Sequence, residues 1–373
     1  MKKQITSEIA GLFAIYGEFI NAGIFGSGHI NDTFLSCWNQ AGTKTRYIHQ
    51  RINNQIFIHP DKVMENILRV TNHITNKNRE AGVQDLSRHS LTVVHAKDGK
   101  PWARDAEGNW WRTYLFIEDS YTKDTASSLE EARFLGEGAG LFQRQLADLT
   151  LPRLHDTIPD FHNMEKRYLR FYEALKKDTH KRSKDAAFEI DFLIKNEERG
   201  AALDCALREG LIIERICHND TKMNNILIDN KDSKALCMID LDTVMPGTSL
   251  YDLGDLIRTA ANRAAEDETD ILKVDFDTGF YKSLLTGYLS QTLVFLTAEE
   301  KKLLAESGRN ITQIMGLRFL TDFLEGDHYY HTIRPKHNLE RCRTQIALIK
   351  SMDSKWETIQ EITHELTNGV NSE

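Results

Sequence analysis

A polar loop at residues 218–225 carries the densest set of side chains that could do chemistry. It reads His-Asn-Asp-Thr-Lys-Met-Asn-Asn, leads into a short apolar run, and is followed by another acid at Asp240. Phosphoryl transfer needs a carboxylate that orients and deprotonates an acceptor hydroxyl. It also needs an Asn and a second Asp that hold Mg²⁺ on the phosphates. The loop therefore predicts a site for phosphoryl transfer.

The spacing inside this loop supports that interpretation. His-x-Asp-x-x-x-x-Asn, with a hydrophobic strand and a further Asp about 15 residues later, is the spacing of the catalytic and metal loops of kinases. A polar turn with capping Asn and Asp residues is the alternative, but a sequence this specific rarely arises by chance.

A glycine-rich segment at residues 25–33 could bind the phosphates. Gly26 and Gly28, with Ser27 between them, would let backbone N–H groups approach phosphate oxygens closely. The segment is not a dinucleotide-binding fingerprint, because no helix follows and Asn31 stands at the third glycine position. It also lacks the Gly-Lys-Ser/Thr of a Walker A loop. An ordinary hairpin turn explains it equally well in isolation, but its position before the Asp220 loop favours a nucleotide loop.

The strand at residues 111–118 precedes the helical half of the chain. In a two-lobed kinase such a strand becomes the hinge whose backbone hydrogen-bonds adenine, which here would involve Phe116 and Ile117. A core strand with an aromatic stripe fits the same residues.

The elements that must position these residues divide into two groups. Apolar residues at helical spacing predict an amphipathic helix between residues 9 and 20, and residues 61–76 predict a second helix. The rest of the first group reads as strands and hairpins, at residues 34–38, 46–52, 91–95, 102–104 and 110–117. Later segments read as helices, at residues 129–146, 166–177, 186–207 and most of 252–369, with one hairpin at residues 225–239. We expect an α+β, two-lobed fold with an antiparallel β lobe at 1–118 and a mainly helical lobe at 119–373.

Composition limits the function classes. The 373 residues include 47 Lys+Arg and 55 Asp+Glu, for a net charge of −8, and this mild acidity gives no support to a nucleic-acid or membrane-surface partner. Five cysteines without a Cys-x-x-Cys pair argue against a disulfide framework and fit a reducing compartment. No stretch approaches the ~18 apolar residues of a membrane-spanning helix. We therefore expect a cytoplasmic protein whose partner is a small molecule. The sequence leaves the oligomeric state open, and a monomer is compatible with it.

Taken together, these stretches resemble the aminoglycoside phosphotransferase/choline kinase superfamily of small-molecule kinases. Within it they are most similar to the N-acetylhexosamine 1-kinases. The stretches that carry the resemblance lie at residues 26–33, 218–227, 239–247, 252–258 and 317–329. The likeness extends over nearly the whole chain and is weakest at the two ends and at 150–200.

The resemblance implies roles for individual residues. Asp220 matches the catalytic base, and Asn225 and Asp240 match the Mg²⁺ ligands. The glycine-rich residues named above would cover the phosphates of ATP. Positions that line the sugar pocket are matched by His29, Asn31, Thr243, Arg318 and Tyr329.

One position departs from protein kinases. The strand Tyr47-Ile48-His49-Gln50-Arg51 places Gln50 where the third strand of a protein kinase carries its lysine. No Lys–Glu pair with the following helix can be assigned, and Glu65 on that helix has no predicted role. Either Arg51 substitutes for the lysine or the phosphates are held differently.

The activity implied is ATP- and Mg²⁺-dependent phosphorylation of the anomeric hydroxyl of N-acetylglucosamine or N-acetylgalactosamine. A kinase of another small molecule, of the aminoglycoside, choline or homoserine type, is the nearest alternative. A cationic acceptor would favour an acidic or aromatic pocket. The positive charge of Arg318 at the predicted pocket disfavours such an acceptor. A non-catalytic nucleotide- or sugar-binding protein is a more distant alternative, because the predicted base and both metal ligands are present.

Overall fold

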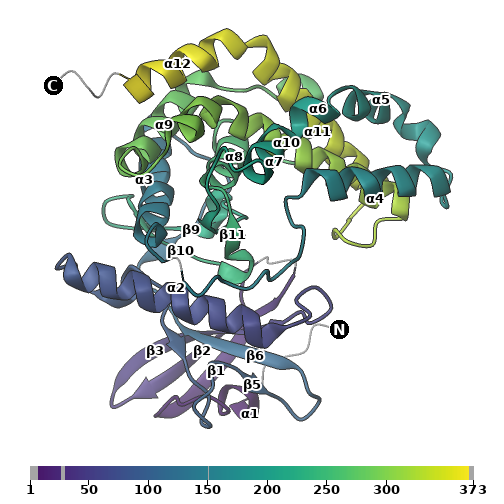
Figure 1. Cartoon of the computed structure of the whole chain (residues 1–373). Coiled ribbons are helices and arrows are strands. Elements are labelled where there is room, and N and C mark those ends of the chain that lie inside the picture. Colours follow the sequence, from purple (N-terminus) through teal and green to yellow (C-terminus); the bar gives the residue numbers. More distant parts are fainter. Residues whose placement is uncertain (1–6, 27–29, 150, 369–373) are drawn as a thin grey trace.

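The computed structural model describes residues 7–26, 30–149 and 151–368 and has two lobes (Figure 1). The N-terminal lobe is built on an antiparallel sheet, and the C-terminal lobe is built of helices. The α+β, two-lobed architecture expected from the sequence is confirmed. The predicted boundary between residues 118 and 119 falls in the segment that joins β6 to β7 and stays a prediction.

Among the described residues, six strands make the N-terminal sheet, in the order β1-β2-β3-β6-β4 with β5 beside β6. Because side chains alternate between the faces of a strand, one face buries Phe34, Trp38 and Trp111 in a small core, and the other face packs into the main core. The register places Gln50 of β3 directly opposite Arg112 of β6. The strands are β1 (Glu18–Ile24), β2 (Asp32–Gln40), β3 (Thr43–Ile52), β4 (Val93–Val94), β5 (Ala103–Arg104) and β6 (Trp110–Leu115).

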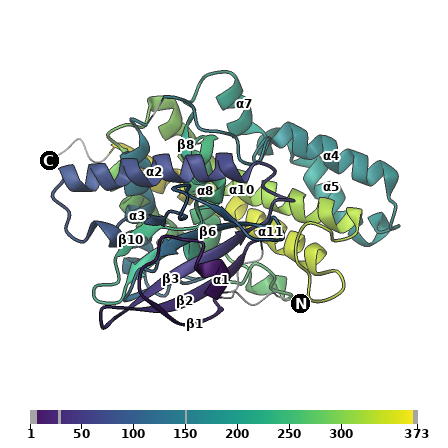
Figure 2. The ribbon, with the colours of Figure 1, turned by 90° about the horizontal axis from the view of Figure 1, so that it is seen from below.

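Helix α2 (Pro60–Glu80) runs across the sheet, as Figure 2 shows, and faces the C-terminal lobe in Figure 1. Proline in the first turn suits a helix start because its missing N–H would have no partner there. Asn66 ties this helix to the C-terminal lobe. Its Nδ2 donates to the carbonyl oxygens of His155, at 2.8 Å, and Val244, at 2.9 Å.

The expected helix between residues 9 and 20 is wrong. Only α1 (Ser7–Ala10) is helical there, and residues 18–24 form strand β1. Gly17 causes the change, because its φ of +117° is a conformation that favours glycine and a Cβ there would overlap the carbonyl oxygen of Asn39. The chain therefore turns and pairs with β2. The apolar residues that suggested one helix do not share one buried face, because Phe13 is buried while Tyr16 is exposed.

The C-terminal lobe packs its helices around one large core. The helix predicted at residues 186–207 is divided into a 3₁₀ turn and three short helices. The α-helices are α3 (Leu129–Leu146), α4 (Met164–Lys177), α5 (Ala187–Lys195), α6 (Glu197–Gly200), α7 (Ala202–Arg208), α8 (Ser249–Ala260), α9 (Thr278–Thr292), α10 (Ala298–Glu325), α11 (His337–Ser354) and α12 (Trp356–Asn368). The 3₁₀ turns are η1 (Leu86–Arg88), η2 (Ser183–Ala186), η3 (Met223–Asn225), η4 (Leu241–Thr243) and η5 (Ile271–Lys273). No helix among the described residues has both the length and the apolar character needed to cross a membrane.

Glycines let α3 and α9 approach closely. A Cβ at Gly136 would overlap the carbonyl oxygen of Leu284, and a Cβ at Gly287 would overlap that of Arg133. The backbones of the two helices therefore touch, and α3 is fixed beneath the hairpin that follows the polar loop.

Two small sheets hold the polar loops of the C-terminal lobe. The predicted hairpin is present as β9 (Ile226–Asp229) and β10 (Ala235–Met238), and β7 (Ser120–Tyr121) adds a third strand that the sequence did not indicate. A second pair joins β8 (Arg215–Cys217) to β11 (Met245–Gly247). The polar loop leaves β8 and enters β9, and the Asp240 segment leaves β10 and enters β11. The two loops therefore lie side by side.

Candidate active site

The polar loop is fixed by a buried carboxylate on helix α8. This helix begins after Thr248, whose side chain accepts from Leu250 N, and Asp252 lies in its first turn. One carboxylate oxygen of Asp252 accepts the backbone N–H of His218, at 2.8 Å, and the other accepts that of Asn219, at 2.7 Å. Asn219 has a φ of +64°, an uncommon conformation for a residue other than glycine. The loop is therefore held in a defined shape by charge-assisted hydrogen bonds.

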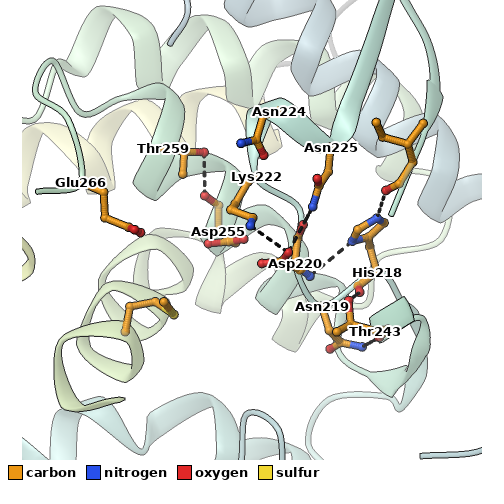
Figure 3. A network of polar contacts seen from close by, with 12 residues as sticks. His218, Asn219, Asp220, Lys222, Asn224, Asn225, Thr243, Asp255, Thr259 and Glu266 are labelled. Carbon is orange, nitrogen blue, oxygen red and sulfur yellow. Dashed lines mark hydrogen bonds and ion pairs between the residues drawn. The ribbon is translucent and has the colours of Figure 1, made fainter. Parts of the chain in front are cut away.

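Asp220 stands at the centre of a polar network (Figure 3). Its Oδ2 lies 3.1 Å from Lys222 Nζ and 3.1 Å from Asn225 Nδ2. His218 accepts the Asp220 backbone N–H on Nδ1, at 3.3 Å, and donates through Nε2 to Ile239 O, at 2.8 Å. Burial alone would raise the pKa of Asp220, but the charge of Lys222 and its hydrogen bond to the carboxylate outweigh burial and lower the pKa. Asp220 is therefore an ionised carboxylate, as a group that orients a hydroxyl and accepts its proton must be.

Asp240 follows β10 in the left-handed conformation, with a φ of +60°. Burial, together with the negative charges of Asp242 and Asp220, raises its pKa to about 6. Asp220 pairs with Lys222 and Asp242 pairs with Arg112, so Asp240 is the acid of these three that has no ion-pair partner among the described residues. Asn225 uses its Nδ2 on Asp220, which leaves its carbonyl oxygen as a hard donor.

This donor set fits Mg²⁺ bound together with a nucleotide. Within the described ranges there is no cluster of three or more His, Cys, Asp or Glu side chains that could hold a metal ion. Magnesium in phosphate-transferring sites is commonly bound by only one or two carboxylates, and substrate phosphates and water complete the shell. The side-chain oxygens of Asn225 and Asp240 meet that requirement.

A buried ion pair connects the sheet to the Asp240 segment. Arg112 of β6 donates through Nη1 to Asp242 Oδ1 and through Nε to Gln50 Oε1, at 2.9 Å. Asn31 donates from Nδ2 to Asp242 Oδ2, at 2.5 Å, and accepts the Asn53 N–H on Oδ1, at 2.9 Å. The carboxylate of Asp242 thus joins the sheet, the end of the glycine-rich segment and the Asp240 segment.

The predicted nucleotide residues that the structure describes follow two strands of the sheet, with Gly26 after β1 and Phe116 and Ile117 after β6. Gly26 has a φ of +73° with open space where a side chain would be. Phe25 packs edge-on against Phe116, at 5.8 Å between ring centroids. Phe116 N donates to Arg46 O, at 3.0 Å, and Ile117 is buried beside it. Ser27, Gly28 and His29 lie outside the described residues.

The predicted acceptor residues occupy different positions. Arg318 and Tyr329 line an open hollow of about 330 Å³. The Arg318 guanidinium stacks over Phe161, at 4.7 Å, and the next residue, His162, donates to Asn219 O, at 2.9 Å, so the hollow adjoins the polar loop. Thr243 lies within the loop network itself.

Thr243 and Asn31 use their side chains on protein partners. The Thr243 hydroxyl donates to His218 O, at 2.7 Å, and so fixes the first residue of the polar loop. Asn31 is buried in the Arg112–Asp242 network described above. The structure therefore brings Asp220, Asn225, Asp240 and Thr243 together, places Arg318 and Tyr329 in the adjoining hollow, and places Asn31 on the sheet side.

Comparison with known proteins identifies the family. A sequence profile of the phosphotransferase enzyme family APH matches residues 24–291, which is more than half of the chain. The chain belongs to this family. The matched range contains the glycine-rich segment, the polar loop and the Asp240 segment, whereas Arg318 and Tyr329 of the hollow lie beyond it.

Solved structures share the backbone. An aminoglycoside phosphotransferase from Alicyclobacillus acidocaldarius subsp. acidocaldarius DSM 446 has a TM-score of 0.56 at 13% identity and covers 99% of this chain and 97% of its own. An ethanolamine kinase from Plasmodium vivax gives 0.57 at 14%, covering 87% and 82%. Spectinomycin phosphotransferase APH(9)-Ia, in complex with ADP and spectinomycin, gives 0.54 at 14%, covering 94% of each chain. At this identity the likeness shows the fold, which is the expected two-lobed, kinase-like one.

Several residues of this APH phosphotransferase site were not assigned from the sequence. Arg112 is a lone charge within an aromatic strand, and Asp242 is an acid two residues after Asp240, and both features are visible in the sequence. Lys222 and Asp252 belong to the stretches that carry the family resemblance, but their contacts with Asp220 and with the loop backbone depend on the fold.

Proposed function

We propose that this APH phosphotransferase is an N-acetylhexosamine 1-kinase. It transfers the γ-phosphoryl group of ATP to the anomeric hydroxyl of N-acetylglucosamine or N-acetylgalactosamine. Asp220 aligns that hydroxyl and takes its proton as the O–P bond forms, and ADP leaves. Mg²⁺, when bound with the nucleotide by Asn225 and Asp240, offsets the charge of the phosphates.

The proposed acceptor is supported by which charged side chains around the hollow are paired and which are not. Arg318 has no carboxylate partner among the described residues, since its guanidinium contacts Tyr329 OH at 3.4 Å and Met315 Sδ at 3.6 Å. Glu325 is held by Arg170 through two hydrogen bonds of 2.9 and 2.6 Å. An oxygen-rich, uncharged acceptor suits a hollow that offers a spare cation and aromatic faces.

The acids near the hollow are already engaged. The Asp322 carboxylate accepts four hydrogen bonds of 2.8 to 2.9 Å. One comes from the side chain of Asn338, and the other three come from the backbone N–H groups of His328, Tyr329 and Tyr330. Asp255 and Glu266 both bind Arg258. A cationic acceptor such as an aminoglycoside, choline or ethanolamine would need a free carboxylate, so these pairings favour the neutral sugar.

Steady-state kinetics with a panel of acceptors tests the proposal. We expect ADP release with N-acetylhexosamines and a loss of at least about 100-fold in kcat for Asp220→Asn. Arg318→Met should raise KM for the sugar at least about 10-fold while KM for ATP changes little. Asp148→Asn, an exposed acid bound to Lys77, is the matched control and should leave both constants unchanged. Turnover of an amine acceptor with no turnover of sugars would contradict the acceptor proposal.

A further inference from the structure

The position that supplies the phosphate-binding lysine in protein kinases is occupied here by an uncharged residue. That lysine lies on the third strand of the sheet and pairs with a glutamate of the following helix. Gln50 occupies this position on β3, and Glu65 on α2 instead binds His155, at 2.9 Å. Arg51 forms an ion pair with Asp32, and its side chain is 32% exposed. This ion pair therefore does not bring Arg51 to the Asp240 segment. A cation for the nucleotide phosphates must therefore come from elsewhere.

Arg112 brings a cation to this place from the neighbouring strand. It lies directly opposite Gln50 in the β3–β6 register, and Gln50 Oε1 accepts its Nε–H at 2.9 Å. Its Nη1 donates to Asp242, two residues after Asp240. Among the described residues, Nη2 has no hydrogen-bond acceptor, so one end of the guanidinium retains donors for a ligand.

The surroundings of this guanidinium favour an anion. Its side chain is 1% exposed, so solvent screens its charge little. Asn31, which follows the glycine-rich segment, bonds to the same Asp242 carboxylate. The cation therefore lies where the glycine-rich segment, the sheet and the metal loop meet, and this is the region in which a kinase holds nucleotide phosphates.

Stability alone does not explain the ion pair. Removing an arginine and a carboxylate from water is costly, and apolar residues of similar volume often stabilise a core as well or better. A buried guanidinium that keeps unused donors beside the metal loop is accounted for by a ligand.

We propose that Arg112 binds the α- and β-phosphates of the nucleotide, with Asp242 as its counter-ion. Compared with protein kinases, the phosphate-binding cation lies on the neighbouring strand β6 instead of β3. Its carboxylate partner lies two residues after Asp240 instead of on the helix that follows β3. The inference rests on the proposed use of ATP and is independent of the acceptor. It also implies that Glu65 has no part in nucleotide binding.

Nucleotide affinity measured without any acceptor tests the proposal. Isothermal titration of the full chain with ADP and with adenosine, each in Mg²⁺ and in EDTA, separates phosphate contacts from the rest of the site. Because charge-assisted hydrogen bonds are the strong class, we expect Arg112→Gln to weaken ADP binding about 10- to 100-fold in both buffers. Adenosine binding should change less than about twofold. Glu65→Gln and Arg51→Gln are the controls and should bind ADP as the unaltered chain does.

Each other result is decisive. Equal loss for ADP and adenosine, or no loss for either, would overturn the proposal. Loss of ADP affinity only in Mg²⁺ would also overturn it, because Arg112 would then act through the metal loop. If Arg112→Gln fails to fold, the double variant with Asp242→Asn leaves no unpaired charge and is judged by the same ADP and adenosine criteria. An unaltered chain that binds no ADP would contradict the proposed function itself.

Discussion

Substitution of Asp252 by asparagine should both destabilise the protein and misplace its catalytic loop. Besides the two loop N–H groups, Gln143 Nε2 also donates to this carboxylate, so Asp252 accepts three hydrogen bonds. A hydrogen bond to a charged group contributes about 1.5–3 kcal/mol and a neutral one about 0.5–1.5 kcal/mol, so weakening three bonds costs about 3–4 kcal/mol. The new NH₂ group also faces at least one of these three donors, and an unpaired buried donor costs about 1–3 kcal/mol more. Burial raises the pKa of Asp252, so removing the charge recovers part of the loss. We expect a net cost of about 4 kcal/mol.

Urea unfolding followed by tryptophan fluorescence measures that cost, and steady-state kinetics measures the effect on the loop. A displacement of Asp220 of about 1 Å should lower kcat about 100-fold. Asp148→Asn, with a side chain that is 57% exposed, should change the unfolding free energy by less than about 0.5 kcal/mol. A cost below about 1 kcal/mol for Asp252→Asn together with unchanged kcat would refute the role given to this carboxylate.

Three further predictions concern stability. Gly136→Ala should lower the free energy of unfolding by roughly 2–4 kcal/mol, because the new methyl group overlaps a carbonyl oxygen of α9. Gly279→Ala is the control, since the nearest atom to its new methyl group lies at 3.2 Å, and it should cost far less in the same thermal or urea unfolding. Asn66→Ala removes three interlobe hydrogen bonds, two donated by Nδ2 and one accepted by Oδ1 from His155 N, and should lower the unfolding free energy by about 2–4 kcal/mol. An unchanged unfolding free energy would mean that this tie between the lobes is unimportant. Burial lowers the pKa of His49 from 6.5 to about 4, so the unfolded chain binds the extra proton between these values, and stability should fall by up to about 3 kcal/mol as pH drops through that window. His49→Gln should flatten this part of the pH profile, and an identical slope would contradict the assignment.

The polar loops could be predicted from the sequence because their chemistry is local. Asp220 and Asn225 are separated by five residues on one loop, and the hairpin that follows is encoded by two apolar runs around a polar turn. Helix α2 was predicted for a similar reason, since its buried residues recur at spacings of three and four. Local periodicity and motif spacing therefore predicted the two-lobed fold and placed most of the candidate site residues, whose roles stay predictions.

What the sequence did not indicate depends on contacts between distant residues. Strand β1 forms because Gly17 turns the chain toward β2, and the apolar spacing of residues 9–20 contains no sign of that pairing. Strand β7 is two residues long and exists only because β9 lies beside it. Arg112 and Asp242 are 130 residues apart, so their ion pair becomes visible only when the sheet is placed against the metal loop.

The placement of Asn31 illustrates the same limit. Family resemblance assigns it to the sugar pocket, while in the structure both ends of its amide bind protein groups on the sheet side. Its role as a sugar ligand stays a prediction.

Phosphorus NMR of the reaction product shows whether the phosphoryl group is transferred to the anomeric oxygen of an N-acetylhexosamine. The chain, ATP, Mg²⁺ and N-acetylglucosamine or N-acetylgalactosamine should give a new phosphate resonance that couples to the proton on C1, and Asp220→Asn should give none over the same time. A product whose phosphorus couples to protons on another carbon, or ATP that is consumed with no phosphorylated sugar, would contradict the proposed sugar 1-kinase activity.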